Sequence, residues 1–220
     1  MKLIHKGTEP ASLREYRSDP FATYDGYAAK DDLRAALAEE QGAICCYCMS
    51  RISPGADGMK IEHWAAQSTV EGEGLALAYS NVLGACKGGE GNRREEQHCD
   101  THKGSDGLTI NPTHPSCEQG IKYSRAGEIA SLDPRINRDL CETLNLNTSR
   151  LRNNRKAVLD ALIEGISRKS GGPDTWTRAL LRKEVARWQS RSDGKHHPFC
   201  QVALYQLERW IRARADRHQP

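Results

Sequence analysis

The stretch Ile44-Cys45-Cys46-Tyr47-Cys48 opens the segment that decides the fold of this 220-residue chain. Cys45 and Cys48 have the C-x2-C spacing that lets two thiolates bind one tetrahedral zinc ion from a tight turn. Such a pair needs a second pair, and Cys86 and Cys99 follow downstream, separated by a glycine- and charge-rich stretch. We therefore predict a structural zinc site with the ligands Cys45, Cys48, Cys86 and Cys99.

The segment that contains the four cysteines explains why a metal is needed for folding. Turn formers dominate it from Ile44 to about His102, which predicts short strands and loops in place of long helices. A bound zinc ion would supply folding free energy that so little apolar burial cannot. Either His98 or Cys46 could replace one of the four ligands. The competing interpretation, ordinary buried or free cysteines, is disfavoured by the paired spacing.

Composition limits the class of protein. The chain is 37% hydrophobic and 28% charged, and no run approaches the roughly 18 apolar residues of a membrane helix. The first ten residues carry charges and have no apolar core of a secretory signal. Eight cysteines without such a signal favour metal ligation over disulfides. We expect a protein of the reducing cytoplasm with no membrane segment.

Charge is distributed unevenly along the chain. Residues 1–120 hold 12 Lys and Arg against 18 Asp and Glu, whereas residues 121–220 hold 20 against 11. The basic second part could supply phosphate contacts that hold nucleic acid. The alternative is a solvated helix surface without a ligand.

Periodicity predicts an α+β fold with three parts. Residues 1–42 form an irregular arm and a helix, which Asp31 or Asp32 caps and Gly42 ends. Residues 43–110 form a small zinc-stapled hairpin-and-helix module, and residues 111–220 are mainly helical and basic. After Asn147, helical spacing predicts two amphipathic helices and a third over about 199–214. The arginines outside its apolar stripe are Arg209, Arg212, Arg214 and Arg217.

Three short motifs accompany the cysteines: Glu62-His63, Asn81-Val82-Leu83 and Cys99-Asp100-x-x-Lys103-Gly104. With the C-x2-C pair, this order resembles the zinc-stapled HNH nucleases of the ββα-metal fold, over Cys45 to Gly104. Later elements extend the resemblance over most of the chain, to the HNH subunit family of retron and Septu anti-phage defence systems: Asn111-Pro112, Cys117, Gly127-Glu128-Ile129, Leu144-Asn145-Leu146-Asn147, Leu151 and Arg155. The resemblance implies an ATPase partner subunit.

The residue types suit phosphodiester hydrolysis, which needs an activated water and neutralisation of negative charge. His63 can accept the proton of the water as general base, since a histidine is largely neutral at cellular pH. Glu62 and Asp100 can hold Mg²⁺ or Mn²⁺, hard cations that prefer oxygen ligands. His102 could take a ligand position instead.

The resemblance assigns two further roles. Asn81 corresponds to the middle asparagine of HNH nucleases, whose amide would bind loop backbone and so orient His63. The position of Asp100 is commonly His or Asn in HNH folds, so this aspartate is a departure that leaves the metal ligand open.

Two functions follow. The first is a metal-dependent HNH endonuclease that cuts DNA, with the basic helices holding the backbone and Trp176, Trp188 and Trp210 as candidates for a partner surface. Tryptophans at helical spacing are more often core residues. The alternative is a catalytically silent, zinc-stapled nucleic-acid-binding or adaptor module. The sequence does not distinguish DNA from RNA.

Overall fold

The computed structural model describes residues 1–215 as an elongated α+β molecule, which confirms the predicted class. Two antiparallel hairpins contain the strands β1 Lys60–His63, β2 Val82–Ala85, β3 Ile121–Tyr123 and β4 Ile129–Ser131. The helices are α1 Ala11–Tyr16, α2 Lys30–Glu40, α3 Val70–Glu73, α4 Asp100–Lys103, α5 Ser116–Gln119, α6 Pro134–Arg138, α7 Ser149–Ser170, α8 Arg178–Gln189 and α9 Cys200–Ala215. Short 3-10 turns (η1 Tyr79–Asn81, η2 Arg94–Glu96, η4 Pro173–Thr175) and a π-helical segment (η3 Asp139–Thr143) connect them. The part boundaries at residues 42 and 110 stay a prediction.

The first hairpin, β1–β2, carries the segment that the cysteines enclose. Its register pairs Lys60 with Ala85 and His63 with Val82. Gln41, at the end of α2, fastens that helix to β2: its amide nitrogen donates to the carbonyl of Gly84 at 2.8 Å, and its oxygen accepts from the amide of Gly84 at 2.6 Å. A Cβ atom at Gly84 would lie 2.6 Å from Cε of Met59, so the packing here is close and a larger residue would force the methionine to move.

Helix α2 begins at Lys30, so both predicted caps, Asp31 and Asp32, lie inside it and the N-cap position is Ala29. Ala29 precedes the helix without a side-chain hydrogen bond, and Asp31 and Asp32 lie in the first turn, where their charge favours the helix dipole. Both aspartates are exposed, so the predicted capping role was wrong. The predicted end is correct, because Gly42 follows the helix with a φ of +59° that favours glycine.

The second hairpin, β3–β4, is a small sheet that the sequence did not predict, within residues 111–220, where most of the described residues are helical. Its register pairs Ile121 with Ser131 and Tyr123 with Ile129. The fully buried guanidinium of Arg155 on α7 donates to the carbonyl of Gly127 at 2.6 Å and to that of Leu146 at 2.7 Å. These bonds fix the hairpin turn to α7.

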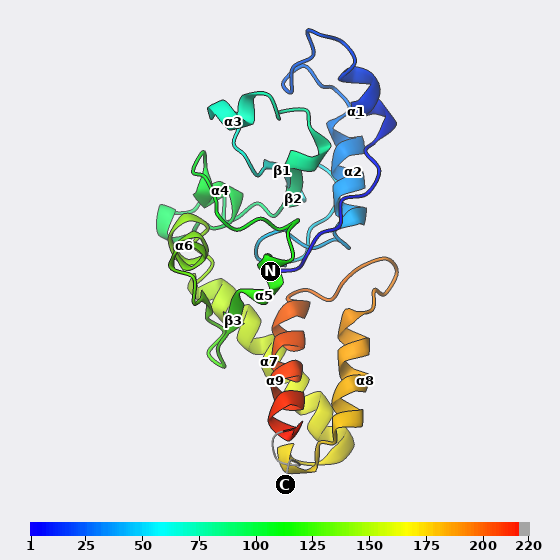
Figure 1. Ribbon diagram of the computed structural model, residues 1–220, viewed down its shortest axis with the longest axis vertical. Coiled ribbons are helices and arrows are strands. Elements are labelled where there is room, and N and C mark those ends of the chain that lie inside the picture. The colour runs from blue at the N-terminus through cyan, green and yellow to red at the C-terminus, as the bar shows by residue number, and fades with distance from the viewer. Residues whose placement is uncertain (216–220) are drawn as a thin grey trace.

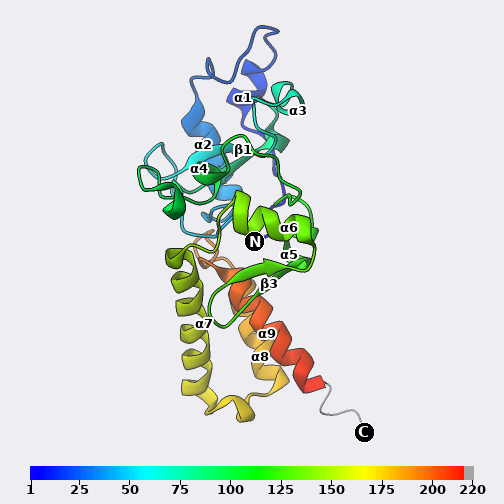
Figure 2. The same cartoon turned by 90° about the vertical axis from the view of Figure 1, so that its left-hand side faces the viewer.

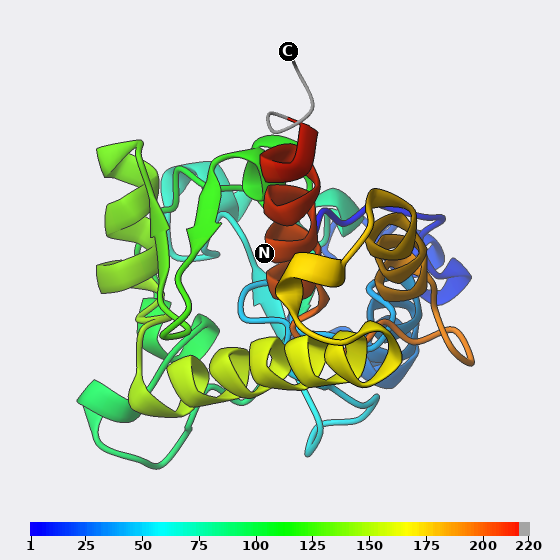
Figure 3. The same cartoon turned by 90° about the horizontal axis from the view of Figure 1, so that it is seen from below.

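The predicted C-terminal helices are confirmed as α7, α8 and α9. Threonine hydroxyls cap two of them: Thr148 accepts from the amide of Leu151 at 3.4 Å, and Thr177 accepts from that of Leu180 at 3.2 Å. Helices α8 and α9 run side by side in opposite directions, with α7 against α9, at the end of the molecule far from β1–β2 (Figures 1, 2 and 3).

The tryptophans and arginines predicted for a C-terminal binding surface differ in their exposure to solvent. Trp176 and Trp188 are buried, and Trp176 packs edge-on against Trp210 at 4.8 Å, so the indole rings belong to the core. Arg209 and Arg212 are exposed, whereas Arg214 donates to the carbonyl of Trp176 at 2.7 Å. Arg217 lies outside the described residues. Through residue 215, no helix is both long and apolar enough to cross a membrane.

Candidate active site and metal centre

A tight turn positions Cys45 and Cys48. The amide of Met49 donates to the carbonyl of Cys45 at 3.1 Å, and Met49 has a φ of +66°, a conformation that L residues rarely adopt. The amide of Ser50 lies 3.4 Å from Sγ of Cys48 and donates to it. This closed turn points both sulfurs in one direction.

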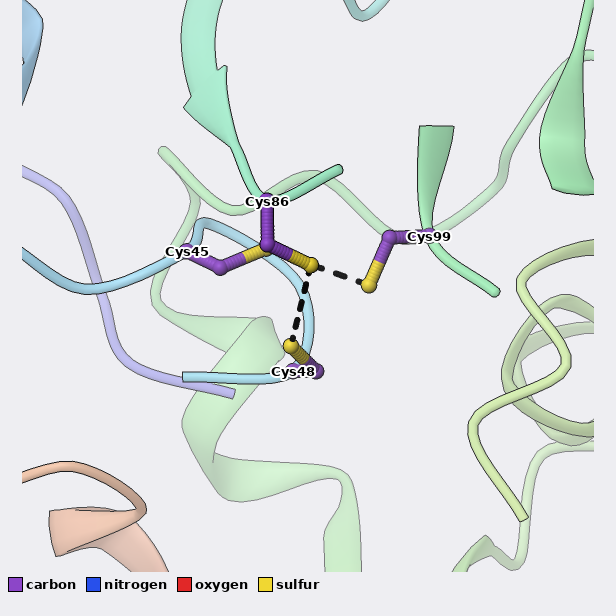
Figure 4. A group of neighbouring side chains, drawn as sticks. All are labelled: Cys45, Cys48, Cys86 and Cys99. Carbon is purple, nitrogen blue, oxygen red and sulfur yellow. Dashed lines mark hydrogen bonds between the residues drawn. The ribbon is translucent and has the colours of Figure 1, made fainter. Parts of the chain in front are cut away.

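The second pair comes from the two ends of the inserted loop. Cys86 follows β2 directly, and Cys99 precedes α4 with a φ of +57°. All four sulfurs are buried and lie within 4.8 Å of one another (Figure 4). The Sγ atoms are 3.7 Å apart for Cys48 and Cys86, and 3.8 Å apart for Cys45 and Cys99.

These separations fit a bound metal. A tetrahedral zinc ion with Zn–S bonds of about 2.3 Å holds its sulfurs about 3.8 Å apart, whereas a disulfide needs about 2.05 Å. The four cysteines are free thiols. Burial opposes charge on Cys45, but hydrogen bonds from neighbouring thiols, among them those of Cys48 and Cys86, hold its pKa well below the usual value. The cluster could therefore hold a metal ion such as zinc.

The two alternative ligands do not belong to this group. Cys46 is buried, and it is not one of the four cysteines whose sulfurs cluster in the part of the chain that the structure describes. Nδ1 of His98 lies 3.2 Å from Sγ of Cys99 and 4.0 Å from Sγ of Cys86, so the ring contacts the sulfurs from outside the set of four.

A second group of polar side chains surrounds a pocket of about 420 Å³ at the end of β1. Glu62 and His63 are the last two residues of that strand, and Asp100 is the first residue of α4. The lining is Ile61, Glu62, His63, Ala66, Gln67, Ser68, Asp100, Gly104 and Ser105. The structure thus brings together the predicted base and both predicted carboxylates.

Glu62 is a buried acid with two donors. Tyr47 donates to its Oε1 at 2.7 Å, and Nζ of Lys103 lies 2.9 Å from the same oxygen. The side chains of Glu62 and Lys103 are 3% and 0% exposed, so this pair is shielded from water. Burial and the nearby carboxyl group of Asp100 raise the pKa of Glu62 to about 8, against the effect of Lys103. Two carboxyl groups that disfavour each other's charge fit a divalent cation.

Lys103 is a site residue that sequence reasoning did not select. It also donates to the carbonyl of His63 at 3.1 Å, so it joins α4 to the end of β1. The signal was its spacing: Lys103 follows Asp100 by three residues, which places both on one face of a short helix.

Asp100 has a cationic partner of its own. Nζ of Lys60 lies 3.2 Å from Oδ2 of Asp100, and it also contacts Glu90 at 3.3 Å. Lys60 and Glu62 are two residues apart on β1, so their side chains share one face of the hairpin. Each predicted metal-binding carboxylate therefore has a lysine beside it.

His63 is held in one tautomer. Its Nε2 lies 2.9 Å from the carbonyl of Ala76, which can only accept, so Nε2 carries the proton. Nδ1 then accepts, and the side-chain amide of Gln67 lies 3.1 Å from it. Burial, with a contribution from Lys103, lowers the pKa of His63. The ring is consequently neutral at pH 7, and its basic nitrogen, Nδ1, contacts Gln67, which lines the same pocket.

Asn81 fixes the loop that carries these contacts. Its Oδ1 accepts from the amide of Ala65 at 2.9 Å, and its Nδ2 donates to the carbonyls of Ala65 at 3.0 Å and Leu75 at 3.3 Å. Ala65 follows His63 by two residues, and Leu75 precedes the carbonyl that His63 binds. Asn81 therefore holds both ends of the loop around the imidazole.

The structure does not bring His102 into this group. Its Nδ1 donates to the carbonyl of Thr143 at 3.0 Å, and it is not among the residues that line the pocket. Two residues along a helix are rotated by about 200°, so a helix that points Asp100 into the pocket points His102 away from it. The alternative of His102 as metal ligand is not supported.

Comparison with known proteins is consistent with this arrangement. No family model matches the chain. The chain is 29% identical over 150 residues to a protein of Vibrio cholerae serotype O1 biovar El Tor described as "Retron Vc95 putative HNH endonuclease". The match covers 65% of this chain and 71% of that protein. This similarity supports the nuclease interpretation in its general form and a relationship to HNH endonucleases of retron type.

Proposed function

We propose that this chain is a metal-dependent HNH endonuclease that hydrolyses phosphodiester bonds of DNA. The observation that carries the proposal is the meeting, in one pocket, of a neutral His63 with Glu62 and Asp100. The cysteine cluster lies at the base of the same hairpin, where zinc would hold its ends together. Similarity to a protein described as an HNH endonuclease supports the same class.

The residues divide the chemistry among them. Nδ1 of His63 would take a proton from the attacking water, while the carbonyl of Ala76 holds the opposite nitrogen as a donor. Glu62 and Asp100 would hold Mg²⁺ or Mn²⁺, which when bound neutralises phosphate charge. Asn81 keeps the imidazole in place through the loop. Gln67 must give up its contact with Nδ1 for the water to approach.

A role in anti-phage defence is proposed on resemblance. The sequence of this chain resembles the nuclease subunits of retron and Septu systems, which implies an anti-phage effector that works with an ATPase partner. The exposed arginines of α9, Arg209 and Arg212, could contribute phosphate contacts.

A second candidate function has one specific observation in its favour. Glu62 and Asp100 are each already paired with a lysine, at 2.9 and 3.2 Å. A zinc-stapled nucleic-acid-binding or adaptor module without catalysis would need no further cation there. Its binding could be intact while cutting is absent.

The test is cutting of plasmid DNA, single-stranded DNA and RNA by zinc-replete protein with Mg²⁺ or Mn²⁺, alone and with an ATPase encoded beside it. His63→Ala should lower cutting by roughly 10²- to 10⁴-fold, the usual contribution of a general base. The matched control is His102→Ala, which removes an imidazole from the same module outside the pocket. If zinc-replete wild type binds nucleic acid but never cuts, the catalytic proposal fails and the binding module stands.

A further inference from the structure

The segment between α1 and α2 lies against the loop that holds His63. Nη1 of Arg17 donates to the carbonyl of Leu77 at 3.2 Å, next to the residue whose carbonyl binds the imidazole. Residues of this segment and of the loop face each other across a cavity of about 660 Å³. The arm therefore contacts the candidate active site from outside the zinc-stapled module (Figure 1).

Tyr24 makes the contact closest to the chemistry. Its ring is perpendicular to the imidazole of His63, with 4.5 Å between the ring centroids. The ammonium of Lys30 lies over the same tyrosine ring, 4.8 Å from its centroid. Tyr24 is half-buried, and burial raises the pKa of its hydroxyl group, so the phenol is neutral at pH 7.

The hydrogen bonds of His63 leave a need for this contact. Nε2 is bound to the carbonyl of Ala76, and Nδ1 is bound to Gln67. Once Gln67 yields its place to water, one hydrogen bond remains, and the ring can still rotate about it. A perpendicular aromatic neighbour restricts that rotation, because it packs against the imidazole wherever the ring plane would turn.

From this geometry we infer that Tyr24 is a positioning residue for His63, holding the imidazole plane so that Nδ1 faces the pocket while Gln67 is displaced. This role rests on the proposed nuclease function. It makes the N-terminal arm part of the active site, although α2 and the turn at residues 45–48 separate Tyr24 from His63 in the sequence.

Three variants test the role by cutting rate. Tyr24→Phe keeps the perpendicular ring and should retain the wild-type kcat within about twofold, while Tyr24→Leu should lower kcat by roughly three- to tenfold with KM unchanged. The matched control is Tyr205→Leu, which removes an edge-on contact with Tyr123, whose ring centroid is 5.7 Å away, at a place far from the pocket. An equal loss in Tyr24→Leu and Tyr205→Leu would mean a stability effect and overturn the role.

A spectroscopic measurement separates this inference from the nuclease proposal. The imidazole C–H proton signal of His63, assigned by its disappearance in His63→Ala, should shift in Tyr24→Leu, because the ring current of the tyrosine is lost, and stay near its place in Tyr24→Phe. An unmoved signal in Tyr24→Leu overturns the contact itself. If the wild type cuts and Tyr24→Leu is equally active, only the positioning role is overturned. If the wild type never cuts, the nuclease function on which the positioning role rests is overturned.

Discussion

Residues 1–215 contain two antiparallel hairpins, β1–β2 and β3–β4, which are held by similar contacts but differ in what those contacts support. In each, one asparagine side chain binds both backbone groups of a single residue: Asn81 pairs with Ala65, and Asn147 pairs with the amide and carbonyl of Ile129, both at 2.9 Å. In each, a buried cation lies nearby, Lys103 beside β1–β2 and Arg155 beside β3–β4. The hairpins differ in what those cations bind.

Arg155 is satisfied by carbonyl and amide oxygens that belong to the fold, at 2.6 to 3.2 Å. Lys103 instead binds Glu62, an acid that lines a pocket together with Asp100 and His63. A hairpin that pairs all its polar groups internally is structural. A hairpin that leaves acids and a base facing a pocket gives up stability, and the cysteine cluster is placed to restore it.

The largest expected effect is removal of that staple. Cys86→Ser should prevent stable folding of the β1–β2 region, because structural zinc contributes on the order of 10 kcal/mol in small zinc modules. Zinc content by native mass spectrometry and thermal unfolding measure the loss. A strong chelator should give wild type the same unfolded behaviour.

The matched control comes from the other hairpin. Cys141 is half-buried beside β4, with Sγ 3.9 Å from the carbonyl of Ile129. Cys141→Ser should keep its zinc and melt within a few degrees of wild type, since the new hydroxyl group can donate to the same acceptors. If both serine variants kept zinc and stability, the four cysteines would not be a metal site.

Alanine substitutions of Asn81 and Asn147 compare the two hairpins more directly, with a smaller expected effect on stability. Asn81→Ala removes the partner of both backbone groups of Ala65 and of the carbonyl of Leu75, and Asn147→Ala removes that of both backbone groups of Ile129 and of the Arg155 guanidinium. Each should lower the free energy of unfolding by about 1–3 kcal/mol. Only Asn81→Ala should also lower kcat of the folded, zinc-replete protein, by roughly tenfold or more, because the loop that orients His63 loosens. Denaturant unfolding and cutting rates on the same preparations separate the two effects.

Equal loss of kcat in both variants would contradict the division between a catalytic and a structural hairpin. So would Asn81→Ala with its rate unchanged, since the loop contacts at Ala65 and Leu75 would then have no catalytic consequence.

The parts of the fold that were predicted correctly have strong local signals. The three C-terminal helices repeat apolar residues over three turns or more, and the C-x2-C turn has a spacing that few other structures need. The hairpin β3–β4 was missed because each strand has only three residues, too few for alternation to show. The capping of α2 was placed wrongly because an exposed aspartate in the first turn resembles a cap in sequence.

Motifs predict which residues belong to the candidate site more reliably than they predict what each residue does. Glu62, His63, Asn81 and Asp100 stand in a recognisable order. Lys103 belongs to the same motif, but its buried pairing with Glu62 was not predicted, since a lysine is almost never fully buried. Tyr24 carries no signal at all, since its contact depends on how the arm folds back. His102 was included for its closeness to Asp100 in sequence, which a helical turn reverses in space.

The smallest expected effect is on pH dependence, and it too should belong to the first hairpin. Burial lowers the pKa of His63, so the folded protein takes up that proton only below about pH 6.5, the ordinary value of histidine. Glu62 has a pKa raised to about 8, so protons compete with the metal for it, and the profile must be measured at saturating Mn²⁺. Under that condition the acid limb of kcat should lie below pH 6.5, with no fall between pH 7.5 and 6.5. The same sign applies to stability: the contribution of His63 is complete above pH 6.5 and is lost as the pH falls toward the folded-state value. Arg155 keeps its charge throughout this range, so β3–β4 should add no such dependence.

Zinc content must be measured at each pH, because acid also protonates thiolates. An acid limb at or above pH 6.5 in zinc-replete protein would mean that the imidazole is exposed to solvent during catalysis, or that another group is the base.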